Sequence, residues 1–407
     1  MSGIILAVMV FMMPVFVRIV PLLAGLYLLN TLLSPAPRWH FPPRNIRPAW
    51  YLIMAFYLLH VVGLLYTEHL SLGTFDLQVK LPLLAFPLII GLVVPPEPKV
   101  MFRIRRAFVF GCVAASLMCL GRAAWIYLVD GAFAFTYTAL SFHMHVGYFA
   151  MYLLMALCFV YVEILEGKGY SSTRWLIVVF FLILMEVLLQ SKMALLLTAM
   201  LLLTAVIASW LKKDRQRLST GLALGAVLLY MLITQFIVTP DVSRVYMASK
   251  NLDLARTETD TKESSMIRLI IWRIAGNIMA EHPVIGVGTG DVMPELKSYY
   301  KDMNLMSAYD QQLNAHNQFF QTTIALGVMG LLVLIALLVC SLVLAWRSHA
   351  WRSLLFLIVT GGHFLTESVL ETQAGTLFFG LFFSLLVLTE PRIREAITVK
   401  NQQVNDR

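Results

Sequence analysis

The sequence has little charge and few cysteines. Only 13% of its residues are charged, about half the share of a typical soluble domain, whereas 59% are hydrophobic. This composition excludes a disordered chain, a coiled coil and an ordinary cytosolic enzyme. The cysteines all lie in apolar runs, which favours buried thiols over a disulfide or metal framework. They are Cys112, Cys119, Cys158 and Cys340.

Several motifs are also missing. The chain has no P-loop, no nucleophile elbow, no internal repeat and no cluster with metal-ligand spacing. We therefore expect no metal and no cofactor. The first apolar run, 3–17, lacks a basic segment before it and a clear cleavage site, which favours a retained helix over a signal peptide.

Long apolar runs dominate the chain. One bilayer-spanning helix takes about 20 residues, so twelve would take roughly 240. The runs are about 3–17, 19–34, 50–66, 81–95, 107–128, 146–165, 175–190, 193–211, 219–239, 317–345, 353–370 and 374–390. We predict an all-α polytopic membrane protein of about twelve transmembrane helices. Residues 1–390 would form one integral membrane domain, with a long loop, 240–315, between spans nine and ten, and 391–407 a cytoplasmic tail.

The basic residues indicate the orientation. With both termini in the cytoplasm, the inner connections carry 19 of the 31 Lys and Arg residues, as the positive-inside bias requires. The short outer connections carry only Arg18, Lys80 and Lys192. The net charge of +8 therefore needs no nucleic-acid partner. The long loop lies outside, where its length exempts it from the bias.

Part of the long loop, 264–280, reads as an amphipathic helix. Ile267, Ile270, Ile271, Ile274 and Ile278 recur at helical spacing, and Ser264 or Ser265 would cap its start. Such a helix would lie on the outer membrane face.

Polar residues near the membrane are functional candidates, because burying them is costly. His316-Asn317 ends the loop and begins span ten, with Gly327 and Gly330 one turn apart further on. A histidine there can accept a proton from an attacking hydroxyl, and the glycines would admit a neighbouring helix. Equally, His316 would be an interfacial capping residue and the glycines ordinary packing.

Three cations are candidates for binding an anion. Arg268, with Trp272 one turn on and Arg273 beside it, could grip phosphate through its guanidinium, or meet lipid headgroups. Lys192, in a tight outer turn, could bind an anionic group or simply snorkel.

A glycine-rich turn, 286–291, contains Gly286 and Gly288 and could present N–H groups to phosphate, or only reverse the chain. The weaker candidates all lie near the outer face. For each of them the main alternative is a structural role. They are His143, His145, Tyr148, Glu68, Lys80, Glu367 and Glu371, and Arg122 within span five. Glu367 and Glu371 could hold His316 or Arg268, or pair with Lys192.

Together these residues resemble the O-antigen ligase and polymerase superfamily of bacterial inner-membrane glycosyltransferases. The family marker is His, then Asn, Ser or Gln, nine residues, and Gly-x-x-Gly. Here His316-Asn317, residues 318–326 and Gly327-Val328-Met329-Gly330 match it completely. The segment SSMIRLIIWRIAGNIMAEHPVIGVGTGD also resembles the family's upstream region. Where relatives often carry an arginine, this chain has Lys192, which keeps the charge but not the bidentate fork.

The resemblance implies a multi-pass enzyme with its active site at the periplasmic face. It would move a glycan from undecaprenyl pyrophosphate to a sugar hydroxyl of an acceptor, by inversion and without a metal. His316 would be the general base, and Arg268, Lys192 and Arg273 would bind pyrophosphate. The supporting residues would be Asn317, Trp272, Gly327, Gly330, Gly286, Gly288, His145, Tyr148 and Glu367.

Five alternatives stay open on sequence grounds. The leading one is an O-antigen ligase with lipid A core as acceptor. A polymerase extending the lipid-linked glycan shares most of these parts. A protein O-oligosaccharyltransferase often has an extra periplasmic region after the last spans, which we do not find here. A lipid-linked glycan transporter predicts charged or broken helices at the midplane, and a membrane scaffold would not need His316 and Arg268.

Overall fold

The computed structural model describes residues 2–33, 41–92, 95–166, 173–211 and 265–391, with residues 225 and 393. These residues form helices and turns, and no strand occurs among them. The longer helices are α1 Ser2–Val15, α2 Val20–Leu32, α3 Arg47–Gly63, α4 Leu70–Lys80, α5 Pro82–Gly91, α6 Pro98–Asp130, α8 Val146–Leu165, α9 Thr173–Leu189, α10 Lys192–Leu211, α14 Ser265–Glu281, α15 Val292–Asp302, α17 Gln318–Arg347, α18 Trp351–Phe364 and α19 Gln373–Phe383. Short helices are α7 Tyr137–Leu140, α16 Met306–Gln311, η1 Val17–Ile19, η2 Val369–Glu371 and η3 Ser384–Leu388.

Each predicted apolar run that the structure describes contains a helix. Five helical stretches are long and apolar enough to cross a membrane: Leu70–Gly91, Pro98–Asp130, Val146–Leu165, Lys192–Leu211 and Gln318–Arg347. The chain is a multi-pass helical membrane protein. The count of twelve stays a prediction, because span nine (219–239) lies outside the described residues, as do residues 240–264 and most of the predicted tail.

One boundary was predicted wrongly. The sequence analysis placed Lys80 in an outer connection before a span at 81–95, but residues Leu70–Lys80 form α4. Its face carries Asp76 and Lys80, and these charges interrupt the apolar pattern from which a span is recognised. Pro82 then starts α5, at a position where a missing N–H costs nothing.

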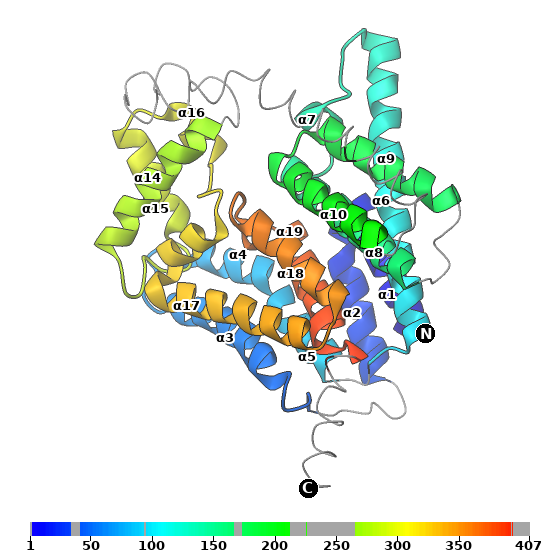
Figure 1. Ribbon diagram of the computed structural model, residues 1–407. Helices are drawn as coiled ribbons and strands as arrows, with labels where there is room; N and C mark the ends of the chain where they lie inside the picture. The colour runs from blue at the N-terminus through cyan, green and yellow to red at the C-terminus, as the bar shows by residue number, and fades with distance from the viewer. Residues whose placement is uncertain are drawn as a thin grey trace, which may run out of the picture.

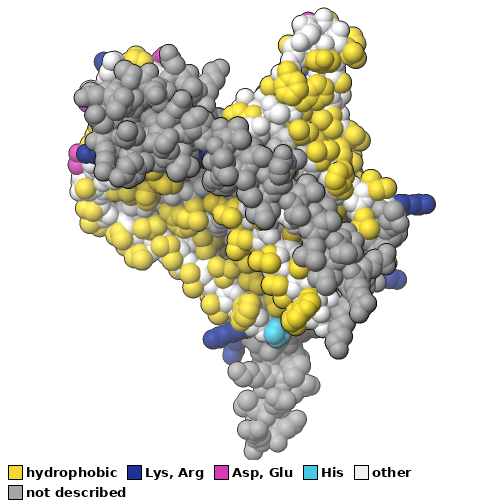
Figure 2. All heavy atoms as spheres, turned by 45° about the horizontal axis from the view of Figure 1, so that its top comes forward, with side chains coloured by type: hydrophobic (Ala, Val, Ile, Leu, Met, Phe, Trp, Pro, Cys, Tyr) yellow, Lys and Arg dark blue, Asp and Glu magenta, His cyan; other side chains and the backbone are white. Residues whose placement is uncertain are grey.

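α8 is the central helix of the membrane bundle. Nearly all of its side chains are buried, as expected of a helix that is hydrophobic on every side. α6, α9, α10 and α18 pack around it, while α17 lies beside α3, and α19 beside α5 (Figure 1). The outer surface is apolar too. Figure 2 shows a broad hydrophobic band with Lys and Arg side chains near its margins, the pattern expected of a surface in contact with lipid.

The described part of the long loop has a hydrophobic core of its own. The five predicted isoleucines of α14 are all buried, which confirms the amphipathic helix. Its apolar face is covered by protein rather than by membrane, because it packs in one cluster with α15, α16 and residues 324–326 of α17. Figure 1 shows α14, α15 and α16 grouped beside the start of α17. The cap predicted at Ser264 or Ser265 stays a prediction, because these side chains lie outside the part of the chain that the structure describes.

α17 is broken at Gly327. This residue has φ 62° and ψ −159°, a backbone region that is essentially restricted to glycine. The break frees the carbonyls of Ile324 and Ala325, which accept hydrogen bonds from Val287 N–H (2.8 Å) and Gly288 N–H (3.0 Å). Gly327 is therefore not a helical packing position as predicted. It marks the point where the glycine-rich turn docks on the helix.

Replacing Gly327 by alanine is expected to lower the stability of the protein by at least about 2 kcal/mol. The new Cβ would be strained at this φ/ψ and would overlap the Val284 carbonyl oxygen. Thermal unfolding in detergent measures the effect. Gly361→Ala is the control, because Gly361 is helical and has open space at its Cβ position. Equal melting temperatures for the two variants would contradict this account of the break.

Candidate functional site

His316 is held at the start of α17 by its neighbour. Asn317 caps the helix, since its Oδ1 accepts hydrogen bonds from Phe319 N–H (2.9 Å) and Phe320 N–H (3.1 Å). The amide of Asn317 donates to Leu365 O at 3.1 Å, which ties the cap to the segment after α18. His316 itself has φ 45°, a left-handed conformation that histidine adopts more readily than most residues. It is only 6% exposed.

Glu367 joins the two main candidates. Its Oε2 lies 3.4 Å from His316 Nδ1, and its Oε1 accepts from Arg268 Nη2 at 2.8 Å. A carboxylate beside Nδ1 favours the tautomer with the proton on that atom, which leaves Nε2 as the basic nitrogen. The structure thus brings together residues 268, 316 and 367, which are far apart in the sequence.

Burial alone would raise the pKa of the Glu367 carboxyl group. The hydrogen bond with His316 and the charge of Arg268 outweigh burial and hold this pKa below its ordinary value of 4.5. Its stabilising contribution is therefore present above pH 4.5 and is lost only as the pH falls through the lowered value. At neutral pH Glu367 is an anion.

The start of α8 forms another wall of the site. Gly147 lies against Glu367, so that a Cβ there would come within 3.1 Å of Glu367 Oε1. His145 caps α8 by accepting from Gly147 N–H (3.2 Å), and the Tyr148 hydroxyl donates to Ser368 O (3.3 Å). The positive end of the α8 dipole adds to the stabilisation of the buried carboxylate. With Glu367 itself, three of the weaker candidates thus lie at the site.

Trp272 connects α14 to the His316 segment. Its indole N–H donates to Ala315 O at 3.0 Å, and its ring packs edge-on against Phe320. Because Trp272 follows Arg268 by one helical turn, this contact positions Arg268 opposite Glu367.

A second buried ionic cluster lies next to the first. Lys80 is 1% exposed and its Nζ lies between Asp76 Oδ1 (2.5 Å) and Glu371 Oε2 (2.7 Å). Gln318 donates to Glu371 Oε1 (3.2 Å) and accepts from Leu370 N–H (2.6 Å). Glu371 therefore pairs with Lys80, whereas the sequence left its partner open between His316, Arg268 and Lys192. Gln318, two residues after His316, links the clusters.

The glycine-rich turn uses the N–H groups of Val287, Gly288, Gly290 and Asp291 for hydrogen bonds within the protein, so these four are not available to phosphate. Besides the two N–H groups that bind α17, Gly290 N–H donates to Thr67 Oγ1 (2.9 Å). Asp291 accepts from Thr67 Oγ1 and from the backbone N–H groups of Glu68 and His69. Burial acts to raise the pKa of Asp291, but these hydrogen bonds lower it overall. Gly286 and Gly288 thus serve to hold the loop against α17 and the α3–α4 connection.

The two remaining cations, Lys192 and Arg273, differ in their placement relative to the cluster. Lys192 begins α10, and the adjoining Met193 lies near Gly362 of α18, so Lys192 is at the end of α18 that leads to Glu367. Arg273 is exposed and follows Arg268 by five residues, or about 140° around the helix. The structure does not bring Arg273 to Glu367 and His316.

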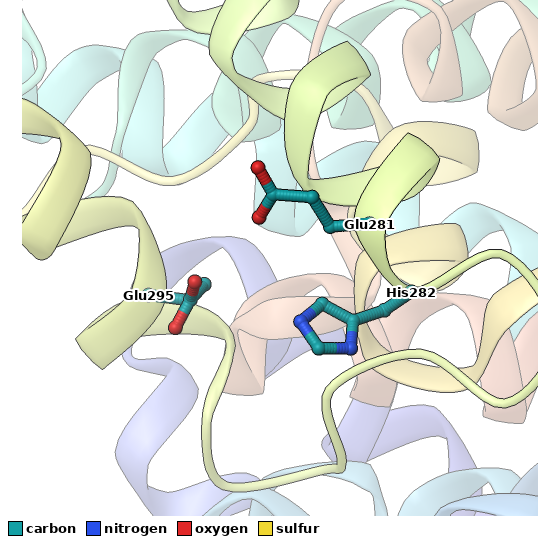
Figure 3. A group of neighbouring side chains, drawn as sticks. All are labelled: Glu281, His282 and Glu295. Carbon is teal, nitrogen blue, oxygen red and sulfur yellow. The ribbon is translucent and has the colours of Figure 1, made fainter.

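Three side chains that the sequence analysis did not group together lie close to one another. Glu281, His282 and Glu295 have ligand atoms within 4.8 Å of one another (Figure 3). The absence of a metal from the reaction stays a prediction. Glu281 also accepts from the Tyr299 hydroxyl at 2.6 Å, which raises the pKa of Tyr299 to about 12. Glu281 lies 13 residues beyond Arg268, about 20 Å along α14. The cluster is distinct from the site of His316.

Fold and site together define a multi-pass helical membrane protein with a His–Glu–Arg cluster at one end of its bundle. Residues 177–335 match the family model described as O-antigen ligase. This match confirms the resemblance to the O-antigen ligase superfamily that the motifs indicate. It runs from within α9 to within α17 and contains Lys192, Arg268, Trp272 and His316. None of the curated proteins matches the chain. The family implies a lipid-linked glycan donor and a glycan acceptor in a membrane.

Proposed function

We propose that this protein is an O-antigen ligase of the bacterial inner membrane. It transfers a glycan from undecaprenyl pyrophosphate to a sugar hydroxyl of lipid A core at the periplasmic face, with both termini in the cytoplasm. The observation that carries the proposal is the contact of Glu367 with both His316 and Arg268.

His316 Nε2 removes the proton from the acceptor hydroxyl as its oxygen attacks the anomeric carbon. The bond from that carbon to the pyrophosphate oxygen breaks in the same step, which inverts the anomeric centre and forms no covalent enzyme intermediate. Glu367 stabilises the imidazolium that forms on His316, as a buried carboxylate does beside a catalytic histidine.

Arg268 binds the departing pyrophosphate, whose negative charge grows in the transition state. Its Nη2 is engaged by Glu367, while its buried Nε has no hydrogen-bond partner among the described residues. The side chain is 25% exposed and so remains accessible to a phosphate oxygen. Lys192 adds a second positive charge. His316 thus serves as the base, and Arg268 and Lys192 stabilise the charge of the leaving group, so that the reaction needs no metal ion.

The test is a transfer assay with purified protein, an undecaprenyl-pyrophosphate glycan, and two acceptors, core-lipid A and delipidated core, with and without EDTA. Glycan on core-lipid A, formed equally with EDTA, is expected. Lengthening of the glycan on its own carrier would replace the ligase by a polymerase. Loss of transfer in EDTA would contradict metal independence, and absence of transfer to every acceptor would contradict the enzyme proposal.

A further inference from the structure

A basic cavity lies at the other end of the bundle. It has a volume of about 780 Å³ and lies between the start of α6, the start of α18 and the segment after α19. Five cations line it: Lys99, Arg103, Arg105, Arg106 and Arg352. This volume is within the range of pockets that bind small molecules, about 300–1,000 Å³.

The cavity is remote from the His316 site. Arg352 is at the beginning of α18, whereas Glu367 follows its end. Glu163 and Glu166 end α8, whereas Gly147 begins it. α8 is 20 residues long, which corresponds to about 30 Å, the thickness of the apolar part of a bilayer. The cavity and the His316 site therefore lie at opposite faces of the membrane.

Two of the five cations are neutralised by the protein. Glu163 is fully buried and pairs with Arg105 Nη2 (2.6 Å) and Arg352 Nη2 (3.2 Å), and Glu166 also pairs with Arg352 (2.5 Å). Among the described residues that line the cavity, five are cations and two, Glu166 and Glu390, are carboxylates. With Glu163 behind them, the described residues leave a positive charge of two, so this lining favours an anion.

Arg352 keeps one unsatisfied N–H donor although its charge is paired, and Arg106 is held in position by aromatic rings. Arg352 is 7% exposed, and its buried Nε has no hydrogen-bond partner among the described residues, although a buried donor normally has one. The Arg106 guanidinium stands 5.4–5.7 Å from the ring centres of Phe102, Phe110 and Trp175. These cation–π contacts fix its position.

The rest of the lining is apolar and includes Met101, Phe102 and Leu385. A free phosphate ion would leave this surface and most of the volume unused, whereas a phospholipid has both a phosphate and apolar chains. Basic pockets between transmembrane helices are suited to lipid headgroups. We propose that this cavity binds the phosphate group of an anionic phospholipid at the membrane face opposite the His316 site.

The test measures lipid retained by the purified protein in native mass spectrometry, with added cardiolipin, phosphatidylglycerol or phosphatidylcholine. The variant K99Q/R106Q removes two lining cations that take no part in the buried ion pairs. The control R44Q/R347Q removes two exposed cations outside the cavity. Thermal unfolding in detergent verifies that all three proteins are folded.

The two anionic lipids are expected to bind to wild type and to the control, and to bind about thirtyfold more weakly to K99Q/R106Q. Phosphatidylcholine is expected to bind weakly to all three. Equal retention of phosphatidylcholine, or equal loss in both variants, would overturn the proposal. Displacement of the lipid by an equal concentration of inorganic phosphate would also overturn it, because the site would then recognise a free anion. No outcome depends on glycan transfer.

Discussion

The variant His316→Asn is expected to transfer glycan 10²- to 10⁴-fold more slowly than wild type, the usual contribution of a general base. Asparagine is chosen because it tolerates the positive φ of this position, 45°, so that the loss reports on chemistry and not on folding. The fall should appear in kcat, with an unchanged KM for the donor, because proton removal is needed only in the transition state.

A matched control is available in this chain. His349 also has a positive φ, 49°, and lies between α17 and α18, at the end of both helices remote from Glu367. His349→Asn should retain full activity and the wild-type melting temperature. If His316→Asn were as active as His349→Asn, His316 would not be the base.

Arg268→Ala is expected to reduce kcat by about 10²- to 10³-fold, the cost of removing one group that stabilises developing charge. Arg268→Lys should be intermediate, because lysine keeps the charge but loses the second N–H group of the fork. Initial rates with the undecaprenyl-pyrophosphate donor measure both effects.

Arg273→Ala is the control for Arg268. It makes the same change of charge on the same helix, five residues further on, at an exposed position. If Arg273→Ala reduced the rate as much as Arg268→Ala, the effect would come from the overall charge of α14, and the specific role of Arg268 would be wrong.

The sequence predicts the helices well because a bilayer requires long apolar runs, and such runs are visible without a structure. It misses α4, whose Asp76 and Lys80 satisfy each other inside the protein. In a sequence, a buried ion pair and two exposed charges look the same. The partners of these residues come from distant segments, such as Glu371 for Lys80.

The sequence predicts which residues form the site better than it predicts the contacts among them. His316 and Arg268 are found from their motifs, but nothing in the sequence decides that Glu367 contacts both. Gly327 was recognised, yet its backbone conformation depends on the approach of the 283–288 segment to α17. The grouping of Glu281 and His282 with Glu295 depends on how α14 meets α15, which no short spacing encodes.

The break in α17 explains why nine residues separate His316-Asn317 from Gly327 in the family marker. Residues 318–326 are helical, and nine residues rise about 13.5 Å. Both ends of this piece are fixed, at Asn317 by the contact with Leu365 and at Gly327 by the docked turn. One inserted residue would turn His316 by about 100° relative to the turn and direct its imidazole away from Glu367. The nine-residue spacing thus fixes the direction in which His316 points around the helix axis, relative to the glycine-rich turn that anchors α17 at Gly327.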